Sequence, residues 1–225
     1  MLKIKNTAKI ATIKTTKYIK YLFMDIVTSL NKLHYKVCES VYEPAEDSFL
    51  LIKYTKNLKG KILEIGCGSG VVCLTNALKN SKNIVFACDR SKDALKLTRE
   101  NAKLNKLTNV KIFESNLFSK VPKTERFDYI LFNPPYLPTI KEEKLVGNIN
   151  YAYDGGKDGR IVLDKFLGQF SKFLKPGGAV FLIHSSLNNS EKTISILSKK
   201  GFVVRTLEQQ RCFFEKLMVL RIKKA

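Results

Sequence analysis

Three glycines at alternate positions, Gly66, Gly68 and Gly70, constrain the fold of this 225-residue chain more than any other feature. Residues 61–65 before them, with apolar side chains at positions 62, 63 and 65, are typical of a short buried strand, and residues 71–74 after them begin a helix. Glycine lets the backbone approach a ligand closely, and a helix N-terminus favours a carboxylate or a polar cofactor group. The placement of the glycines between strand and helix therefore predicts an α/β fold with a ligand at the loop.

An acidic residue, Asp89, stands at the end of the next apolar run, residues 84–88. It follows the glycine loop by about 20 residues, where an acid can accept hydrogen bonds from both hydroxyls of a ribose. The alternative is that Asp89 caps the helix predicted for residues 92–105, although Ser91 could supply that cap instead. Glycine loop and acid together indicate a cofactor that contains a nucleoside.

The remaining pattern continues the alternation of strands and helices. A helix begins within residues 43–52, where a proline and acids precede apolar residues, and another occupies residues 161–174 until Lys-Pro-Gly-Gly stops it. Further strands are expected at 110–114, 127–132 and 179–184, with a helix at 190–200. Residues 202–207 and 213–222 predict two strands joined by a short polar link, hence a terminal antiparallel hairpin.

The four residues Asn133-Pro134-Pro135-Tyr136 follow directly on the strand predicted at 127–132. The two prolines make the loop stiff and extended. The Asn133 side-chain oxygen and the Pro134 carbonyl can then accept two hydrogen bonds from one planar –NH₂ group, while Tyr136 packs on the face of its plane. Such acceptors would orient the nitrogen for attack on an electrophile. The alternative is a plain turn between a strand and a loop.

Two other stretches are notable for length or charge. Residues 137–160 are too long and too rich in glycine for a simple connection, and predict a lid over the substrate or, alternatively, a surface loop. Residues 1–23 carry six lysines at positions 3–20 and no acid. We assign residues 1–38 to a basic, partly disordered extension and residues 39–225 to one catalytic domain. A tail without function is the simplest interpretation of the extension; a nucleic-acid or ribosome tether and a transit peptide are the alternatives.

The composition is basic, with 40 Lys and Arg against 20 Asp and Glu, a formal net charge of +20. Such a surface favours acidic partners such as RNA, ribosomes or DNA, unless the lysines are simply spread over solvated faces. The five cysteines form no Cys-x-x-Cys pair and the chain has only two histidines, so we expect no metal site and reduced, cytoplasmic thiols. No apolar run approaches the length of a membrane span, and we expect no membrane partner.

The order of these motifs resembles a class I S-adenosylmethionine-dependent methyltransferase. Within that class the chain is similar to the HemK family, in the eukaryotic and archaeal branch that methylates the glutamine of the Gly-Gly-Gln motif in class 1 peptide release factors. The resemblance extends over residues 41–222 and rests on four segments, 41–48, 63–70, 133–136 and the Gly-Gly-x-x-Gly-Arg sequence of 155–160. It implies a seven-stranded mixed sheet with helices on both faces and a C-terminal antiparallel hairpin.

The resemblance also implies roles for individual residues. It assigns the methionine end of S-adenosylmethionine to Glu64, Gly66, Gly68 and Gly70 with Ser48 nearby, the ribose to Asp89, the adenine to Asn116 and Leu117, and the target amide to Asn133, Pro134, Pro135 and Tyr136. Asn133 is also expected to contact the cofactor. Asn116 departs from the aspartate that is common in the family, which removes a charge beside the adenine. The family's branch also implies a small zinc-binding activator subunit, for which the strand at 110–114 is the expected docking edge.

Two other functions fit parts of the pattern. An adenine-N6 methyltransferase on DNA or RNA would use the same Asn-Pro-Pro-Tyr loop, because an exocyclic adenine amine presents the same planar –NH₂, and the basic charge favours it. However, such an enzyme must extrude a base, and beyond residues 137–160 no segment is large enough for a recognition domain. A non-catalytic module that binds RNA or ribosomes is the third hypothesis, against which the complete set of motifs argues.

Overall fold

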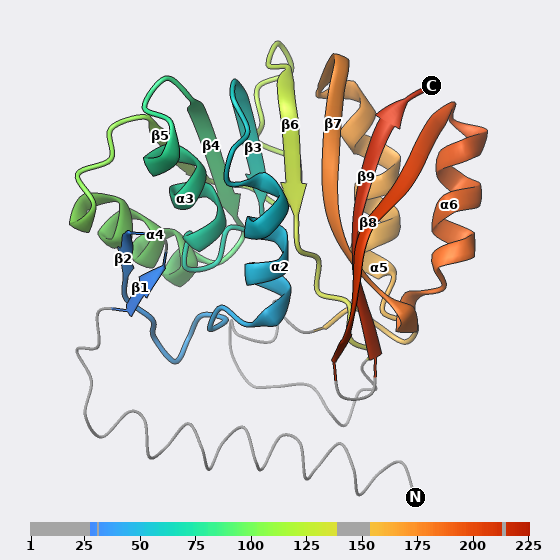
Figure 1. The fold of residues 1–225 in the computed structure, drawn as a ribbon, viewed down its shortest axis with the longest axis horizontal. Coiled ribbons are helices and arrows are strands. Elements are labelled where there is room, and N and C mark those ends of the chain that lie inside the picture. The colour runs from blue at the N-terminus through green and yellow to red at the C-terminus, as the bar shows by residue number, and fades with distance from the viewer. Residues whose placement is uncertain (1–27, 31, 139–153, 213–214) are drawn as a thin grey trace, which may run out of the picture.

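The computed structural model describes residues 28–30, 32–138, 154–212 and 215–225 (Figure 1). The basic segment 1–23 and most of the expected lid at 137–160 lie outside the described residues. Among the residues described, no helix combines the length and the apolar character that a membrane span requires.

The core of the fold is a seven-stranded sheet with the strand order β5-β4-β3-β6-β7-β9-β8 (Figure 1). The pairs from β5 to β7 are parallel, whereas β9 runs antiparallel to both β7 and β8. This confirms the predicted mixed sheet and terminal hairpin. The strands are β3 Lys61–Ile65, β4 Ile84–Asp89, β5 Val110–Glu114, β6 Phe127–Phe132, β7 Leu174–Ser185, β8 Phe202–Cys212 and β9 Glu215–Lys224.

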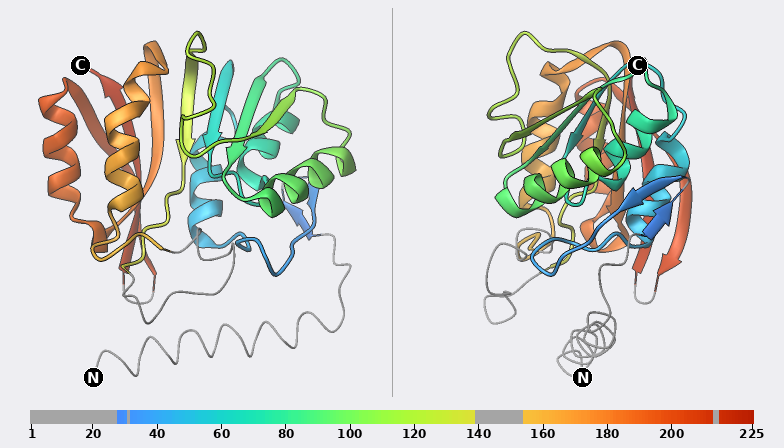
Figure 2. Two further views of the ribbon diagram at one scale, coloured as in Figure 1. Left: turned by 180° about the vertical axis from the view of Figure 1, so that it is seen from behind. Right: turned by 90° about the vertical axis from the view of Figure 1, so that its left-hand side faces the viewer.

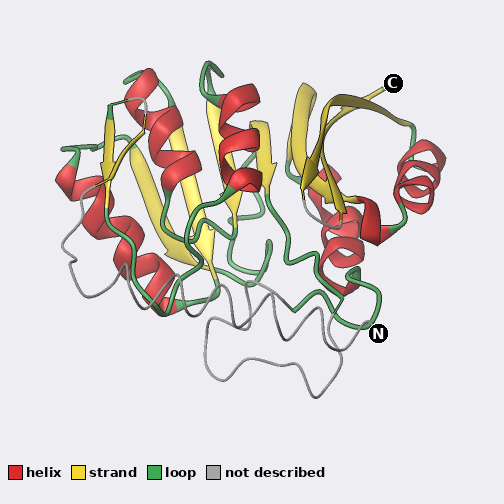
Figure 3. Ribbon diagram, turned by 60° about the horizontal axis from the view of Figure 1, so that its bottom comes forward, coloured by secondary structure: helices red, strands yellow, loops and turns green. Residues whose placement is uncertain are grey.

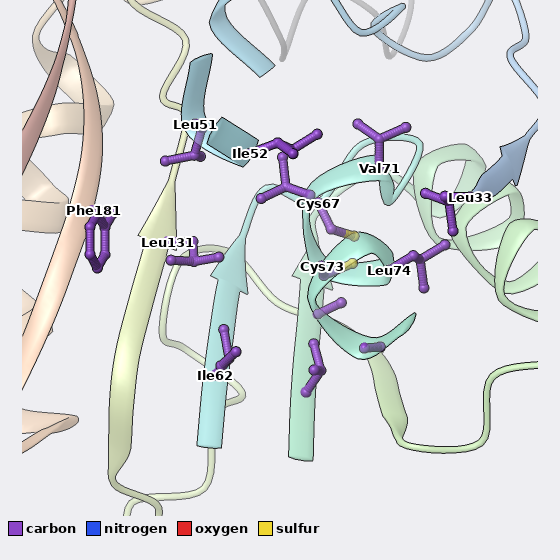
Figure 4. Close-up of a cluster of buried hydrophobic side chains, with 14 of the residues drawn as sticks. Leu33, Leu51, Ile52, Ile62, Cys67, Val71, Cys73, Leu74, Leu131 and Phe181 are labelled. Carbon is purple, nitrogen blue, oxygen red and sulfur yellow. The ribbon is translucent and has the colours of Figure 1, made fainter. Parts of the chain in front are cut away.

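Helices cover both faces of the sheet, as predicted (Figure 2). One buried cluster joins one face of the sheet to α2 and α3 through Leu51 and Leu74, and Figure 4 shows its centre. A second cluster joins the other face to α5 and α6 through Phe166 and Leu197. The helices are α2 Glu46–Thr55, α3 Val71–Lys79, α4 Lys92–Leu104, α5 Ile161–Gln169 and α6 Ser190–Lys199, with short 3₁₀ turns η3 Phe170–Lys172 and η4 Ser186–Asn188.

Two strands are longer than the sequence pattern predicts. β7 begins at Leu174, which pairs with Phe127. The register then shifts, and regular pairing resumes between Tyr129 and Ala179. The Pro-Gly-Gly segment that was expected only to stop the preceding helix is thus part of the strand. β8 continues to Cys212 through residues 208–212, which were expected to be a polar link. Because β8 is an edge strand, its exposed positions tolerate polar side chains.

A short hairpin of β1 (Thr28–Leu30) and β2 (Leu33–Tyr35) precedes the first helix and was not predicted. Leu33 and Tyr35 are buried in the core. The Asn105 side chain binds both backbone groups of His34, accepting from its N–H at 2.9 Å and donating to its carbonyl at 2.6 Å. This hairpin lies within the segment 1–38 that we assigned to the extension, so residues 33–35 pack with the domain. The division at residue 38 otherwise stays a prediction.

Candidate active site

A pocket lies at the carboxyl ends of β3, β4 and β6, the end of the sheet that Figure 3 brings toward the viewer. The parallel strands end there together, so the loops that follow them converge on one place. All but one of the sequence-predicted site residues line this pocket: Ser48, Glu64, Gly66, Gly68, Asp89, Asn116, Leu117, Asn133, Pro134, Pro135 and Tyr136. Residues as far apart in the sequence as Ser48 and Tyr136 are thus brought into one site.

The exception is Gly70, which does not line the pocket. A Cβ atom on Gly70 would lie 2.8 Å from Thr98 Cγ2 of α4, so this glycine allows two helices to approach each other. Gly68 differs, because a Cβ there would meet no atom within 4 Å. Both glycines have a positive φ that favours glycine, +86° at Gly70 and +56° at Gly68, but of the two only Gly68 lines the pocket. We therefore assign Gly70 to packing and keep the other two glycines at the pocket.

Glu64 ends up as a buried carboxyl group in the pocket wall, with 3% of the residue exposed. Its Oε2 accepts a hydrogen bond from the backbone N–H of Cys73, in the first turn of α3, at 2.7 Å. Burial raises the pKa of Glu64 to about 8, and this hydrogen bond lowers it only in part. The free protein at neutral pH therefore holds mainly the protonated acid at this position.

Asp89 supports the glycine loop as well as facing the pocket. Its Oδ2 accepts from Gly68 N at 3.0 Å, and its Oδ1 accepts from Ser91 N at 2.8 Å. Burial raises the pKa of Asp89, while these backbone donors lower it. The cap of α4 is the Ser91 hydroxyl, which accepts from Ala94 N at 3.3 Å. Because carboxylate oxygens accept several hydrogen bonds each, Asp89 can still accept from a ligand.

The expected adenine side of the pocket consists of Asn116 and Leu117, in the loop after β5. Leu117 is buried and has a positive φ of +52°, which is uncommon for a residue other than glycine. The Ser115 hydroxyl holds it there by donating to the Leu117 carbonyl at 2.8 Å. Asn116 is exposed, and its backbone N–H donates to Ser119 Oγ at 3.2 Å. The two residues thus offer an apolar surface and a polar amide.

Asn133 carries the most informative atom of the site. Its Oδ1 is buried and accepts no hydrogen bond within the described part of the chain. A buried acceptor without a donor costs free energy of about 1–3 kcal/mol, so such atoms are rare in native proteins. The next residue, Pro134, has a carbonyl and no N–H to satisfy. The site therefore presents acceptors that suit a ligand with an –NH₂ group.

One residue of the site, Asp47, was not predicted. It is buried in the first turn of α2 and lines the pocket. Its Oδ2 accepts from the hydroxyls of Tyr42 at 2.9 Å and Tyr136 at 3.3 Å. Its Oδ1 accepts from the backbone N–H and the hydroxyl of Ser48 at 2.5 and 3.1 Å. Asp47 therefore fixes the Tyr136 ring, and the only sequence signal for it was an acid in the first turn of a helix, where acids are common.

Tyr136 is held as a neutral donor. Burial and the neighbouring Asp47 carboxylate raise its pKa above the ordinary value for a phenol. Its hydroxyl is therefore protonated at neutral pH and donates to Asp47, so Tyr136 orients groups rather than removing protons.

The Gly-Gly-x-x-Gly-Arg segment, residues 155–160, packs against the backbone of residues 135–137, at the end of the Asn-Pro-Pro-Tyr loop. Gly155 N donates to the Leu137 carbonyl at 3.1 Å. A Cβ on Gly155 would lie 2.8 Å from the Pro135 carbonyl oxygen, and one on Gly159 would lie 2.3 Å from that of Tyr136. Only glycine permits this close contact between the two backbones. The described end of the expected lid is thus packed, whereas residues 139–153 lie outside the described residues.

Comparison with known proteins agrees with this geometry. The family model of the methyltransferase small domain matches residues 45–149. A putative protein N5-glutamine methyltransferase of Methanocaldococcus jannaschii is 45% identical over 196 residues, which cover 87% of this chain and 98% of the relative. Human methyltransferase HEMK2 is 33% identical, covering 82% and 90% of the two chains. The eRF1 methyltransferase catalytic subunit mtq2 of Schizosaccharomyces pombe is 31% identical, covering 85% and 93%.

Solved structures show the same fold. The E. cuniculi Mtq2–Trm112 complex matches with a TM-score of 0.63 at 23% identity, over 83% of this chain and 99% of the other. TYW2 of P. horikoshii in complex with MeSAdo matches with a TM-score of 0.61 at 16% identity, over 88% and 71%. The identity to the archaeal, human and fission-yeast relatives over most of both chains shows that the chain belongs to the HemK family of class I S-adenosylmethionine-dependent methyltransferases, in its archaeal and eukaryotic branch.

Proposed function

We propose that this protein transfers a methyl group from S-adenosylmethionine to the side-chain amide nitrogen of the glutamine in the Gly-Gly-Gln motif of a class 1 peptide release factor. The observation that carries this function is the buried Asn133 Oδ1, which has no donor among the described residues and lies in the pocket. The names of the archaeal and fission-yeast relatives support the same reaction and substrate.

The pocket residues suit the cofactor. Asp89 offers carboxylate oxygens to the ribose hydroxyls, Leu117 an apolar surface to the adenine, and Glu64 with the glycine loop borders the methionine end. The open space beside Gly68 leaves room for close approach of a ligand to the backbone. S-adenosylmethionine supplies an electrophilic methyl group on a positively charged sulfur that is already a good leaving group.

The chain's own residues prepare the nucleophile. The lone pair of an amide nitrogen is delocalised, so the amide reacts poorly unless it is oriented. Asn133 Oδ1 and the Pro134 carbonyl can each accept one N–H of the target –NH₂ group, which fixes the plane of the amide. Tyr136, held by Asp47, borders the same space. Orientation of this kind contributes on the order of 7–11 kcal/mol in favourable cases.

The test is transfer of labelled methyl to three substrates: a class 1 release factor, the same protein with the Gly-Gly-Gln glutamine changed to alanine, and duplex DNA. We expect label on the intact release factor alone. The Asn133→Ala variant should retain cofactor binding and lose most turnover, by a factor of about 100 or more, because it removes an orienting acceptor. Unchanged turnover would reject the role of Asn133, and label on DNA would support an adenine-N6 activity instead.

A small zinc-binding activator subunit is the second partner that we propose. The fission-yeast relative is named a catalytic subunit, and the E. cuniculi structure is a complex with Trm112. In this chain β5 is the outermost strand of the sheet and pairs with β4 on one side. Its other edge is, within the described residues, open for an added strand, which is a common mode of recognition.

A further inference from the structure

Asn188 lies directly behind the catalytic loop, outside the pocket lining. We propose that Asn188 is a positioning residue for methyl transfer: its side-chain amide fixes the Tyr136 end of the Asn-Pro-Pro-Tyr loop and thereby aims the acceptors of Asn133 and Pro134. This role rests on the proposed function of that loop. Asn188 does not itself line the pocket and acts through the backbone of the loop.

The first support is the hydrogen bonding of the Asn188 amide group. Asn188 is 1% exposed and belongs to η4, the turn after β7. Its Nδ2 donates to the Tyr136 carbonyl at 2.7 Å and to the Gly159 carbonyl at 3.2 Å. The Asp158 carbonyl also lies 3.5 Å from Nδ2, so the two amide hydrogens face three carbonyls, while Asn188 Oδ1 accepts no hydrogen bond within the described residues. One side chain thus joins the catalytic loop, the 155–160 segment and the β7–α6 connection.

The second support is that Asn188 is itself held rigidly by Arg160. This arginine is 2% exposed, and its Nη1 donates to the Asn188 carbonyl, to the Asn189 carbonyl at 3.1 Å and to Thr193 Oγ1 at 2.9 Å. Its Nη2 donates to Asp164 Oδ1 at 2.6 Å. A planar guanidinium with several fixed partners has little freedom, so the backbone that carries Asn188 is well fixed.

The hydrogen-bond network around Arg160 ends on a histidine, His184, that is neutral at physiological pH. Thr193 Oγ1 accepts from Arg160, so its hydroxyl hydrogen is free to donate to His184 Nε2, 2.9 Å away. His184 Nδ1 then carries the ring hydrogen and donates to the Ser185 carbonyl at 2.8 Å. Burial, together with the nearby positive charge of Arg160, lowers the pKa of His184 to about 4. The support of Asn188 therefore stays constant across neutral pH.

The third support is the shape of the loop. Its first residue follows β6, which is fixed in the sheet, and its two prolines allow little internal rotation. The Tyr136 carbonyl is then the point at which the far end of the loop is fixed. In such a stiff segment, a small displacement at Tyr136 is transmitted to the Pro134 carbonyl. A misplacement of about 1 Å from a distant mutation can cost about 100-fold in rate.

The cofactor side should be independent of this support. Glu64 on β3 accepts from Cys73, and Asp89 on β4 accepts from Gly68 and Ser91. Within the described residues, none of these donors forms a hydrogen bond with the Asn188 side chain. A loss of Asn188 should therefore leave the dissociation constant of S-adenosylmethionine unchanged. A general loss of structure would weaken cofactor binding and turnover together.

The test compares two substitutions with a matched control. Asn188→Ala removes the donor, and Asn188→Asp keeps the size while replacing the donor by an acceptor. The control is Asn83→Ala: Asn83 is also 1% exposed, and its Nδ2 donates to the carbonyls of Leu58 at 3.0 Å and Asn76 at 2.9 Å. It lies in the loop before β4, at the opposite end of the sheet from the pocket.

We expect both Asn188 variants to lower kcat on the release factor by about 10- to 100-fold, with KM and the cofactor dissociation constant changed by less than about threefold. Asn83→Ala should lower Tm to a similar degree and leave kcat unchanged. Equal losses of kcat in Asn83→Ala and Asn188→Ala, or full activity of Asn188→Asp, would overturn the positioning role.

A second readout does not need the release factor. Hydrogen exchange of the peptide spanning residues 132–138 should accelerate in Asn188→Ala and stay at the wild-type rate in Asn83→Ala. If the wild-type protein failed to methylate a release factor, the proposed function would fail while this exchange result still decided whether Asn188 fixes the loop. Unchanged exchange in Asn188→Ala would refute the inference by itself.

Discussion

Glu64 is mainly protonated in the free pocket at neutral pH, and in the proposed complex it would border the methionine end of a positively charged cofactor. A nearby positive charge favours the ionised carboxylate, so binding should lower the pKa of Glu64 from about 8. At pH 7 the cofactor must then displace a proton. We expect affinity to rise with pH up to about 8 and to level off above it.

Calorimetry can measure this proton. Titration of S-adenosylmethionine at pH 7 in two buffers of different ionisation enthalpy should give different heats for the wild type and equal heats for Glu64→Gln. Glu114→Gln serves as the control, because the Glu114 side chain is 45% exposed and belongs to β5. Equal heats for the wild type in both buffers would show that Glu64 does not titrate on binding.

Most of the predicted residues that line the pocket lie at or shortly after the end of a strand, with Ser48 of α2 as an exception, and their roles in binding stay predictions. Strand ends are recognisable, so Asp89 and Asn133 could be placed at one edge of the sheet before the structure. Gly70 could not be separated from Gly68, because a glycine that admits a ligand and one that admits a neighbouring helix have the same sequence signature. Asp47 was missed because its partners, Tyr42 and Tyr136, are contacts of tertiary structure.

The two edges of the sheet, β5 and β8, differ in what the proposed activator would do to them. β5 is a short strand whose outer edge faces no described strand, and β8 is the edge at the far side. If the activator adds a strand to β5, outward amides of Val110–Glu114 acquire hydrogen-bond partners. Their hydrogen exchange should slow in the complex by at least about tenfold.

Exchange measured with and without a Trm112-type subunit would test this docking edge. The amides of β8, Phe202–Cys212, provide the internal control and should exchange at the same rate in both samples. Protection of β8 with no change at β5 would place the partner on the opposite edge and reject the docking site that we propose.

At the scale of elements, strands with apolar runs were predictable and their limits were not. β8 extends through polar residues because an edge strand needs few buried side chains. The β1–β2 hairpin escaped prediction since its strands are three residues long. Asn101 of α4 and Asn105, which follows this helix, bind the backbone around it. Such support comes from residues about 70 positions away, which a local pattern cannot reveal.

The charge of the whole molecule bears on its stability as well as on its partners. A formal net charge of +20 produces self-repulsion, which destabilises a compact state. Positive charges face each other in the terminal hairpin, where Arg205 lies directly opposite Arg221, and Arg211 opposite Lys216. Like charges at such cross-strand positions are unfavourable. Added salt should therefore raise the Tm of the protein by screening these pairs.

Arg205→Glu should isolate this effect, because it converts one repulsive pair into an attractive one. We expect its Tm at low salt to exceed that of the wild type by about 1–3 °C, and the difference to shrink toward zero near 1 M salt. Lys165→Glu is the matched control: it changes the net charge equally, but its neighbours one helical turn away, Ile161 and Gln169, are uncharged. If both variants gained equally, the net charge of the molecule would govern its stability; a gain confined to Arg205→Glu would locate the repulsion in the hairpin.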